Sequence, residues 1–255
     1  MSPLLFSFYL NGLETFLTDK NIKGLDLVDA NNIEYLGVYL RLFILLYADD
    51  AVLLSETPEG LQDVLDVFGL YCDQWKLKVN ISKTKIVVFS KRKSNVECDF
   101  KFKHNKIEIC DGFTYLGLKF NYNGSFMLAK KTLIEQAQKA MYSVFRKIQN
   151  LPLAIDLQLK LFDTLILPIL TYCCEVWGFE NITEIERVHL NFCKRILRIR
   201  QTTPNFMVYG ELGRFPLSVH IRCRMISFWC KLQSENKLAS KLYHLLIYLK
   251  NFKGC

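Results

Sequence analysis

Residues 42–54 read LFILLYADDAVLL, two very apolar runs on either side of an acidic pair, Asp49-Asp50. The first run begins at Leu36, the second ends at Leu54, and both are rich in branched and aromatic residues. Only Ala48-Asp49-Asp50 separates the runs, and so short a connection between two apolar runs favours a tight β-hairpin buried on both faces.

The acidic pair is the most informative feature of this hairpin. Adjacent carboxylates repel each other and resist desolvation, so Asp49 and Asp50 persist where a cation neutralises them or where the tip stays wet. Mg²⁺ takes carboxylate oxygens, and two such ions stabilise the attacking and leaving oxygens of phosphoryl transfer. A solvated turn is the alternative, because aspartate is common in turns.

Outward from the hairpin, the front of the chain predicts a mixture of helices and short strands. Ser2-Pro3 and Thr57-Pro58 each suit the start of an amphipathic helix. We expect a turn over residues 80–83, then a strand over Ile86–Phe89. Further expected strands are a hairpin of Phe100–Lys103 and Ile107–Ile109 around His104-Asn105, and an extended stretch over Tyr115–Tyr122 that ends at Asn123-Gly124.

From Phe126 onward the pattern changes to helices. Thr183 and Glu186 have the spacing of a capping box in front of a helix over Ile185–Ile199. We therefore predict an α+β fold with two domains, residues 1–124 of mixed structure and residues 125–255 all helical.

The charge of the chain is divided unevenly along its length. Residues 1–90 hold 7 Lys/Arg and 12 Asp/Glu, whereas residues 91–255 hold 26 and 13, so net charges of −5 and +13 make up the total of +8. An acidic front and a basic back suggest a cation site followed by a surface that binds a polyanion. A merely solvated basic face is the alternative.

Composition favours a folded intracellular protein. Half of the residues are hydrophobic and 23% are charged, which predicts a packed core. No apolar run reaches the roughly 20 residues that span a bilayer, so we expect no membrane partner, and we see no signal peptide. Nine cysteines without a CxxC or a metal-ligand spacing suggest reduced thiols.

Tyr47-Ala48-Asp49-Asp50 resembles the Tyr-x-Asp-Asp hairpin of reverse transcriptases, and further segments match that family in order. Ser2–Phe6 with Leu10–Leu13 resembles the helix after motif B, Trp75–Asn80 with Lys83–Lys85 resembles motif D, and Tyr115-Leu116-Gly117 resembles the primer-grip hairpin. Leu161–Asp163, Pro168–Leu170, Glu175–Gly178 and Tyr209–Arg214 resemble the segment after the palm. Together they resemble the later part of a reverse-transcriptase core from a non-LTR (LINE-type) retrotransposon.

The resemblance implies a role for each matching residue. Asp49 would be a direct Mg²⁺ ligand with Asp50 beside it, and Lys83 would assist the leaving pyrophosphate. Tyr47 would place the hairpin tip near the primer end, and Tyr115, Leu116 and Gly117 would hold the primer strand. An exposed turn lysine at 83 and a core aromatic at 115 are the plain alternatives.

The basic half would correspond to the thumb, which rides the template–primer duplex. Lys131, Lys139 and Arg146 recur opposite the apolar face of the helix over Phe126–Gln149. Arg187, Lys194 and Arg198 recur on a second helix. Spaced cations along a helix suit phosphate contacts without base readout.

The sequence also departs from the family. A third metal-binding aspartate on an earlier strand, the Gln-Gly pair before Ser-Pro and the fingers have no counterpart here. Asp19, Asp26 and Asp29 are not expected in a buried strand that opposes the hairpin. Two adjacent carboxylates are a poor cage for two ions, so positioning and charge stabilisation would both suffer.

Two functional hypotheses follow. The first is a fragment of an RNA-directed DNA polymerase, comprising a partial right-hand palm, primer grip and thumb. It would use Mg²⁺, an RNA template, a DNA primer and deoxynucleoside triphosphates, and would be inactive alone without the remaining part of the element's protein. The alternative is a non-catalytic remnant that binds nucleic acid through its basic helical half.

Overall fold

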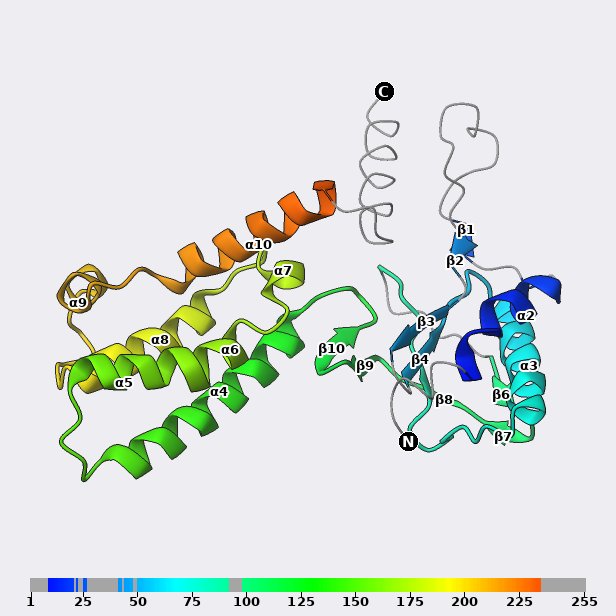
Figure 1. The fold of residues 1–255 in the computed structure, drawn as a ribbon, viewed down its shortest axis with the longest axis horizontal. Helices are drawn as coiled ribbons and strands as arrows, with labels where there is room; N and C mark the ends of the chain where they lie inside the picture. Colours follow the sequence, from blue (N-terminus) through cyan, green and yellow to red (C-terminus); the bar gives the residue numbers. More distant parts are fainter. Residues whose placement is uncertain are drawn as a thin grey trace. The chain divides into compact units, whose positions relative to one another are not determined.

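A computed structural model describes residues 9–20, 22, 25–26, 41–42, 44–47, 50–91 and 98–234, with the backbone alone at 25–26, 41–42, 44–47 and 234. The described parts of residues 1–88 and 93–111 form one compact unit, and those of 89–92 and 112–235 form a second (Figure 1). The helix expected from Ser2-Pro3 begins outside the described residues.

The first unit combines helices with short strands. Its elements are α2 (Leu13–Asp19), β1 (Leu25–Asp26), β2 (Arg41–Leu42), β3 (Ile44–Tyr47), β4 (Asp50–Leu53), α3 (Pro58–Gln74), β5 (Lys85–Ile86), β6 (Lys101–Phe102), β7 (Asn105–Lys106) and β8 (Glu108–Ile109). The described strands pair two by two: β1 with β2, β3 with β4 and β6 with β7 are antiparallel, and β5 with β8 is parallel. Both helices and strands are present, which confirms the α+β class.

Helix α3 organises the core of the first unit, as its amphipathic pattern predicted. Thr57 caps its start, because the side-chain hydroxyl accepts a hydrogen bond from the backbone N–H of Gly60 at 3.1 Å, and Pro58 occupies the first turn. One side of α3 packs with α2 in a cluster made of Leu10, Leu13, Leu17, Ile22, Val64 and Tyr71. The other side packs against the short strands in a cluster made of Leu65, Cys72, Ile86, Phe100, Phe102 and Ile107.

Two expected elements of the first unit differ in their limits. The hairpin around residue 104 exists, but its turn is formed by Lys103 and His104, with Lys103 at a φ of 56°. The strand expected over Ile86–Phe89 is shorter and covers Lys85–Ile86. Asp26 lies in β1, opposite Arg41 of β2, so it is not in a strand paired with the β3–β4 hairpin.

The second unit is a small hairpin followed by helices. Its elements are β9 (Gly112–Tyr115), β10 (Leu118–Asn121), α4 (Met127–Ile148), α5 (Ile155–Leu161), the π-helical turn η2 (Phe162–Ile166), α6 (Leu167–Leu170), α7 (Cys174–Trp177), α8 (Thr183–Ile196), α9 (Asn205–Leu212) and α10 (Leu217–Ser234). The β9–β10 hairpin therefore groups with the helices, and the compact division falls at Gly112, ahead of the expected boundary near residue 124.

Helix α4 is the long support of this unit, and α6 and α8 pack against it (Figure 1). Phe145 of α4, Phe162 of η2 and Phe192 of α8 meet in the core, with ring centroids of Phe162 and Phe192 4.7 Å apart. Trp177 of α7 and Ile221 of α10 are fully buried in the same cluster. The apolar face predicted for the helix over 126–149 is confirmed.

The continuous helical segment α5–η2–α6 contains one π-helical turn in its middle, in which the hydrogen bond spans five residues and not four. The N–H of Leu167 bonds to the carbonyl of Phe162, five residues back. Pro168 follows at once; it has no N–H to donate, and its ring would press on the carbonyl four residues before it. A π-helical turn accommodates such a residue inside a helix.

Two expectations for this unit are wrong in detail. Residues 115–122 are not one extended stretch, because the chain turns at Leu116-Gly117. Thr183 does not cap α8; the carboxamide oxygen of Asn181 accepts the Thr183 N–H at 2.8 Å, and Glu186 bonds elsewhere.

None of the described helices combines the length and the apolar character needed to cross a bilayer.

Candidate functional site

The acidic hairpin forms as the sequence predicted. Strands β3 and β4 are antiparallel, with Ile44 opposite Leu53 and Tyr47 opposite Asp50. Two residues, Ala48 and Asp49, connect the strands, and both lie outside the described residues. Tyr47 and Asp50 thus form the last pair before the connection, which places Asp50 directly at the end of the hairpin.

The expectation that both faces of the hairpin are buried is wrong for β4. Asp50 and Ala51 are exposed, and Val52 and Leu53 are half-buried. Within the described residues, β3 and β4 pair with each other and with no third strand. Leu53 is the point at which β4 joins the core, because it packs against both apolar clusters of α3.

Exposure decides how the carboxylate of Asp50 is tolerated. A wet carboxylate keeps its hydration, so Asp50 persists without a neutralising partner. The resemblance to reverse transcriptases implies a divalent cation, and Asp50 would offer it one carboxylate. Among the residues that the structure describes, no group of three or more His, Cys, Asp or Glu is arranged to hold a metal ion. A Mg²⁺ site at Asp49 and Asp50 therefore stays a proposal.

Lys83 lies in an exposed turn after α3. The turn is closed on Asn80, whose carbonyl accepts the N–H groups of Lys83 at 3.1 Å and of Thr84 at 3.0 Å. The Asn80 side chain also accepts from the Ser82 hydroxyl at 2.7 Å. This turn fixes the backbone at Lys83 and leaves its side chain exposed in solvent.

The segment predicted as a primer grip is the tip of the β9–β10 hairpin. Tyr115 pairs with Leu118 as the last pair of strand residues, so Leu116 and Gly117 form a two-residue turn. Both have positive φ, 48° and 79°, the signature of a type I′ turn, whose twist matches the flanking strands. Gly112, at the other end, faces the Phe120 carbonyl so closely that a Cβ would lie 2.6 Å from that oxygen.

The three residues at this tip differ in exposure. Leu116 and Gly117 are exposed, and Tyr115 is half-buried. The hydroxyl of Tyr172 donates a hydrogen bond to the Leu116 carbonyl, and its ring lies 3.5 Å from the position that a Cβ on Gly117 would take. The tip is therefore held from one side by an aromatic residue and open to solvent on the other.

The cations predicted on α4 are all exposed. Lys131, Lys139 and Arg146 lie away from the buried Leu133–Met141 face, so the basic surface of this helix is available. A further cation, Arg195 of α8, is exposed and has its guanidinium carbon 4.2 Å from the centre of the Phe145 ring. That contact joins α8 to α4 and was not visible in the sequence, because it links residues 50 positions apart.

The cations predicted on the second helix do not share one exposed face. Arg187 is exposed and paired with Glu184 at 2.9 Å. Lys194 is only 6% exposed, and its ammonium donates to the carbonyl of Gln201 at 2.7 Å. The expectation of a surface role for Lys194 is wrong, because that bond holds the chain after α8. Arg198 lies beyond the helix end at Ile196, with a φ of 55°.

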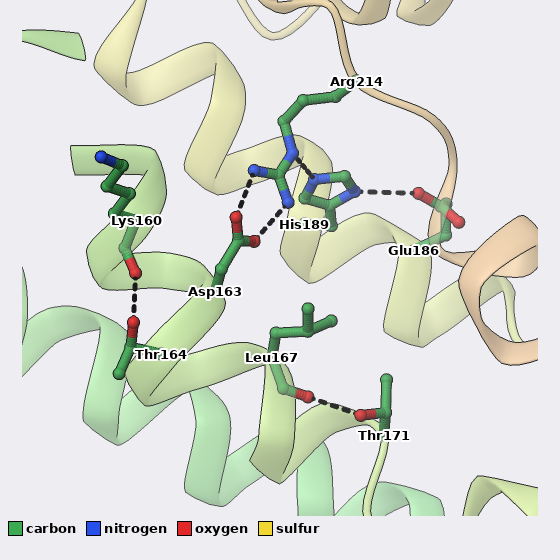
Figure 2. Close-up of polar contacts among 8 residues, drawn as sticks. All are labelled: Lys160, Asp163, Thr164, Leu167, Thr171, Glu186, His189 and Arg214. Atoms are coloured by element: carbon green, nitrogen blue, oxygen red, sulfur yellow. Dashed lines mark hydrogen bonds and ion pairs between the residues drawn. The ribbon is translucent and has the colours of Figure 1, made fainter. Parts of the chain in front are cut away.

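A polar network that we did not predict from the sequence surrounds the buried His189 of the second unit. Figure 2 shows Arg214 between Asp163 and His189, with Glu186 on the far side of the imidazole ring. Arg214 forms a fork on Asp163, with bonds of 2.6 and 3.1 Å, and its Nε donates to His189 Nε2 at 3.1 Å. Because Arg214 Nε can only donate, His189 carries its proton on Nδ1 and donates it to Glu186.

Glu186 is the acceptor at the centre of this network. Its Oε1 also accepts from the Tyr209 hydroxyl, and its Oε2 accepts from the Ser218 backbone N–H at 3.2 Å. Burial raises the pKa of Glu186, but these hydrogen bonds outweigh burial and the pKa lies below its ordinary value. Burial and the bond to Glu186 raise the pKa of Tyr209, so the phenol stays protonated. The network links η2, α8, α9 and the start of α10, and no reactive atom of His189 faces solvent.

Known proteins resemble the chain over more than half of its length. Residues 1–120 match the family model described as reverse transcriptase (RNA-dependent DNA polymerase). A transposon-derived protein of Caenorhabditis elegans is 27% identical over 164 residues, 62% of this chain and 57% of that protein. RNA-directed DNA polymerases from mobile element jockey of Drosophila melanogaster and Drosophila funebris are 24% and 22% identical, over 61% and 62% of this chain. The chain spans 18% of the length of each polymerase. No solved structure matches the chain.

Proposed function

We propose that this chain, which belongs to the reverse transcriptases of non-LTR retrotransposons, contributes the catalytic hairpin, the primer grip and the thumb to RNA-directed DNA synthesis. The reaction would be addition of deoxynucleotides to a DNA primer on an RNA template. The observation that carries the proposal is the β3–β4 hairpin, in which Tyr47 pairs with Asp50 next to Asp49.

Each part of the proposed site has its own task. Asp49 and Asp50 would hold Mg²⁺, which lowers the charge cost of phosphoryl transfer when bound. Lys83, on its exposed turn, would approach the leaving pyrophosphate. Leu116 and Gly117 would contact the primer strand from the tip of the β9–β10 hairpin. The structural support for these roles is the exposure of all the described members of this set.

We expect the chain by itself to be a weak catalyst. Within residues 1–255 we find no counterpart of the third aspartate of the family, and Asp26 lies in β1, which pairs with β2 and not with the hairpin. Two neighbouring carboxylates position two ions poorly. For this reason the sequence led us to expect a chain that is inactive alone; we propose instead that it extends primers slowly by itself, and faster when another segment of the element's protein completes the site.

Primer extension tests the enzyme. The chain is incubated with an RNA template, an annealed DNA primer, deoxynucleotides and Mg²⁺ or Mn²⁺, beside Asp49→Asn and Asp50→Asn variants. We expect slow extension that each substitution lowers by about 100-fold or more, because charge stabilisation at the transferred phosphate is lost. Asp63→Asn, an exposed aspartate of α3, is the matched control and should leave the rate unchanged. Equal extension by the chain and both hairpin variants would reject catalysis at this hairpin.

Binding without catalysis is the second candidate function, and the exposed cations of α4 favour it. Lys131, Lys139 and Arg146 lie on a 22-residue helix, so a duplex that follows the helix can place phosphates along it. A polyanion releases counterions from each phosphate that a cation neutralises, which makes the affinity depend on salt.

Affinity for a labelled RNA–DNA hybrid, measured between about 50 and 200 mM salt, tests this role. We expect log affinity to fall linearly with log salt, and Lys139→Gln to reduce the slope by about one. Lys106→Gln is the control, since Lys106 is an exposed lysine of β7 that is paired with Asp99. Two results rule against phosphate contacts by α4: an affinity that does not change with salt, or a slope that Lys106→Gln reduces as much as Lys139→Gln does.

A further inference from the structure

The chain between α6 and α7 makes a sharp corner that reaches the tip of the β9–β10 hairpin. Tyr172 lies in this corner and contacts both residues of the hairpin turn. Its hydroxyl donates to the Leu116 carbonyl at 2.5 Å, and its ring carbons and hydroxyl lie within 3.7 Å of the Cβ position of Gly117. Tyr172 itself is 41% exposed.

The corner that carries Tyr172 is itself fixed from the core. Trp177, which is fully buried, donates its indole N–H to the Tyr172 carbonyl at 2.8 Å. The next residue, Cys173, has a φ of 52°, so the chain reverses immediately after Tyr172. The backbone of Tyr172 is thus anchored, and only its side chain extends to the hairpin.

A second support comes from α10. Arg224 donates to the carbonyl and the hydroxyl of Thr171, at 3.0 and 2.9 Å, and pairs with Glu175 through two nitrogens at 2.9 and 2.5 Å. One guanidinium therefore holds the residue before Tyr172 and a residue three positions after it. The bonds run without interruption from α10 through the corner to the hairpin tip.

The hairpin tip needs such a support. A two-stranded hairpin is marginally stable by itself, and Leu116 adopts the left-handed conformation that non-glycine residues avoid. Gly117 adopts the positive φ of this turn without steric cost, and the position of a Cβ there lies in ordinary van der Waals contact with the Tyr172 ring, 3.5 Å away. The turn carbonyl is engaged by Tyr172, while the rest of the tip stays exposed.

We propose that Tyr172 is a positioning residue for the primer: it fixes the Leu116–Gly117 turn against the helical unit, so that the tip meets the primer strand in one orientation. The inference rests on the proposed function, in which this hairpin contacts the primer. Thr171, Glu175 and Arg224 act through Tyr172 and touch no substrate themselves.

The test compares the full chain with Tyr172→Phe, which keeps the ring and removes the hydroxyl. Amide hydrogen exchange is followed at Tyr115 and Leu118, the last pair of the hairpin, and, as a check on the fold, at the buried α4 residues around Ala137. We expect exchange at the tip to rise about fivefold, the usual effect of one lost hydrogen bond, with α4 unchanged. Tyr142→Phe, which alters an exposed tyrosine of α4, is the control and should move neither.

A second measurement separates positioning of the primer from stabilisation of the hairpin tip alone. Affinity is measured for a hybrid with a recessed primer 3′ end and for a blunt hybrid of equal length. We expect Tyr172→Phe to lower the preference for the recessed end about fivefold while blunt affinity and its salt dependence stay constant, because no cation is lost. Exchange within twofold of the parent overturns the proposal, and so does an equal loss of affinity for both hybrids.

Failure of the proposed function gives a different result. If the unchanged chain shows no preference for the recessed end, the hairpin does not contact the primer and the positioning role falls with it. Increased exchange at Leu118 in Tyr172→Phe would in that case still show that Tyr172 stabilises the hairpin tip, so the two failures are distinguishable.

Discussion

At the scale of the residue, Glu186 joins three separate donors of the helical unit. It accepts from the imidazole of His189, the hydroxyl of Tyr209 and the backbone N–H of Ser218. A glutamine has one acceptor oxygen and one donor group, so it cannot satisfy all three donors. The carboxylate is therefore the chemical group that this corner of the core requires.

We expect Glu186→Gln to lower the free energy of unfolding by about 1–3 kcal/mol, because a buried donor is left without an acceptor. Urea denaturation measures the change. Glu184→Gln, two residues earlier on the same helix, removes an exposed carboxylate paired with Arg187 and should cost less than about 0.5 kcal/mol. Equal losses in the two variants would show that Glu186 has no special role.

The lowered pKa of Glu186 gives this residue a pH signature. A carboxylate whose pKa falls on folding stabilises the folded chain above its unfolded pKa, and that stabilisation disappears as the pH falls through the lowered value. Below about pH 4 the parent chain should therefore lose stability more steeply than Glu186→Gln. Urea titrations between neutral and acid pH test this, and parallel curves would contradict it.

At the scale of the element, α7 and α10 approach each other through Gly178, just after Trp177. A Cβ there would lie 2.5 Å from the Cys174 carbonyl, 2.5 Å from Ile221 and 2.8 Å from Met225. We expect Gly178→Ala to destabilise the chain by about 1–3 kcal/mol in urea denaturation, because α10 must shift to admit the methyl group.

Gly210, inside α9, is the matched control for Gly178. A Cβ there meets nothing within 4 Å, and α9 is helical around it. Alanine at this position should stabilise the chain by about 0.5–1 kcal/mol, because glycine is a poor helix former. Destabilisation of similar size at both glycines would mean that close packing of α7 on α10 is not the cause.

The sequence predicted the long elements and missed the contacts that join them. Helices α3 and α4 follow from the 3.6-residue period of their apolar residues, and the β3–β4 hairpin follows from its two apolar runs. The parallel pairing of β5 with β8 has no local signal, because its partners are separated by a hairpin. Lys194 fits a surface pattern, yet the chain returning at Gln201 buries it.

The candidate site likewise combines features that neighbouring residues predict with contacts between distant residues that they do not. The acidic hairpin and the Leu116–Gly117 turn are encoded by neighbouring residues, and the family match to residues 1–120 confirms the resemblance on which they were recognised. The Asp163–Arg214 fork and the Tyr172–Leu116 bond join residues 51 and 56 positions apart. Such pairs depend on how the helices pack, so one sequence read locally cannot reveal them.

At the scale of the whole molecule, the cysteines report on folding. The eight cysteines that the structure describes are free, and Cys223 and Cys230 are exposed. Burial raises the pKa of Cys174 to about 11 and of Cys193 to about 12. The thiolate is the reactive form, so buried thiols with a raised pKa are inert near neutral pH.

We expect a thiol reagent at about pH 8 to modify Cys223 and Cys230 in the folded chain, and Cys174 and Cys193 only after urea unfolds it. Peptide mass spectrometry of the modified chain locates the labels. Labelling of Cys193 at the rate of Cys223 under folding conditions would contradict the buried position of α8 in the core.

The path of the backbone through the two units has a practical consequence for dissecting this protein. Residues 89–92 belong with the helices, residues 93–111 with the other unit, and the chain returns at Gly112. Ser90 donates its N–H to the Tyr122 carbonyl, next to β10. Truncation at one position therefore cannot give the whole helical unit. A fragment that begins at Gly112 lacks the first segment of the unit, and a fragment that begins at Phe89 also contains residues of the other unit. An intact helical fragment has to join the segment that begins at Phe89 to a chain that begins at Gly112, without the residues that belong to the other unit.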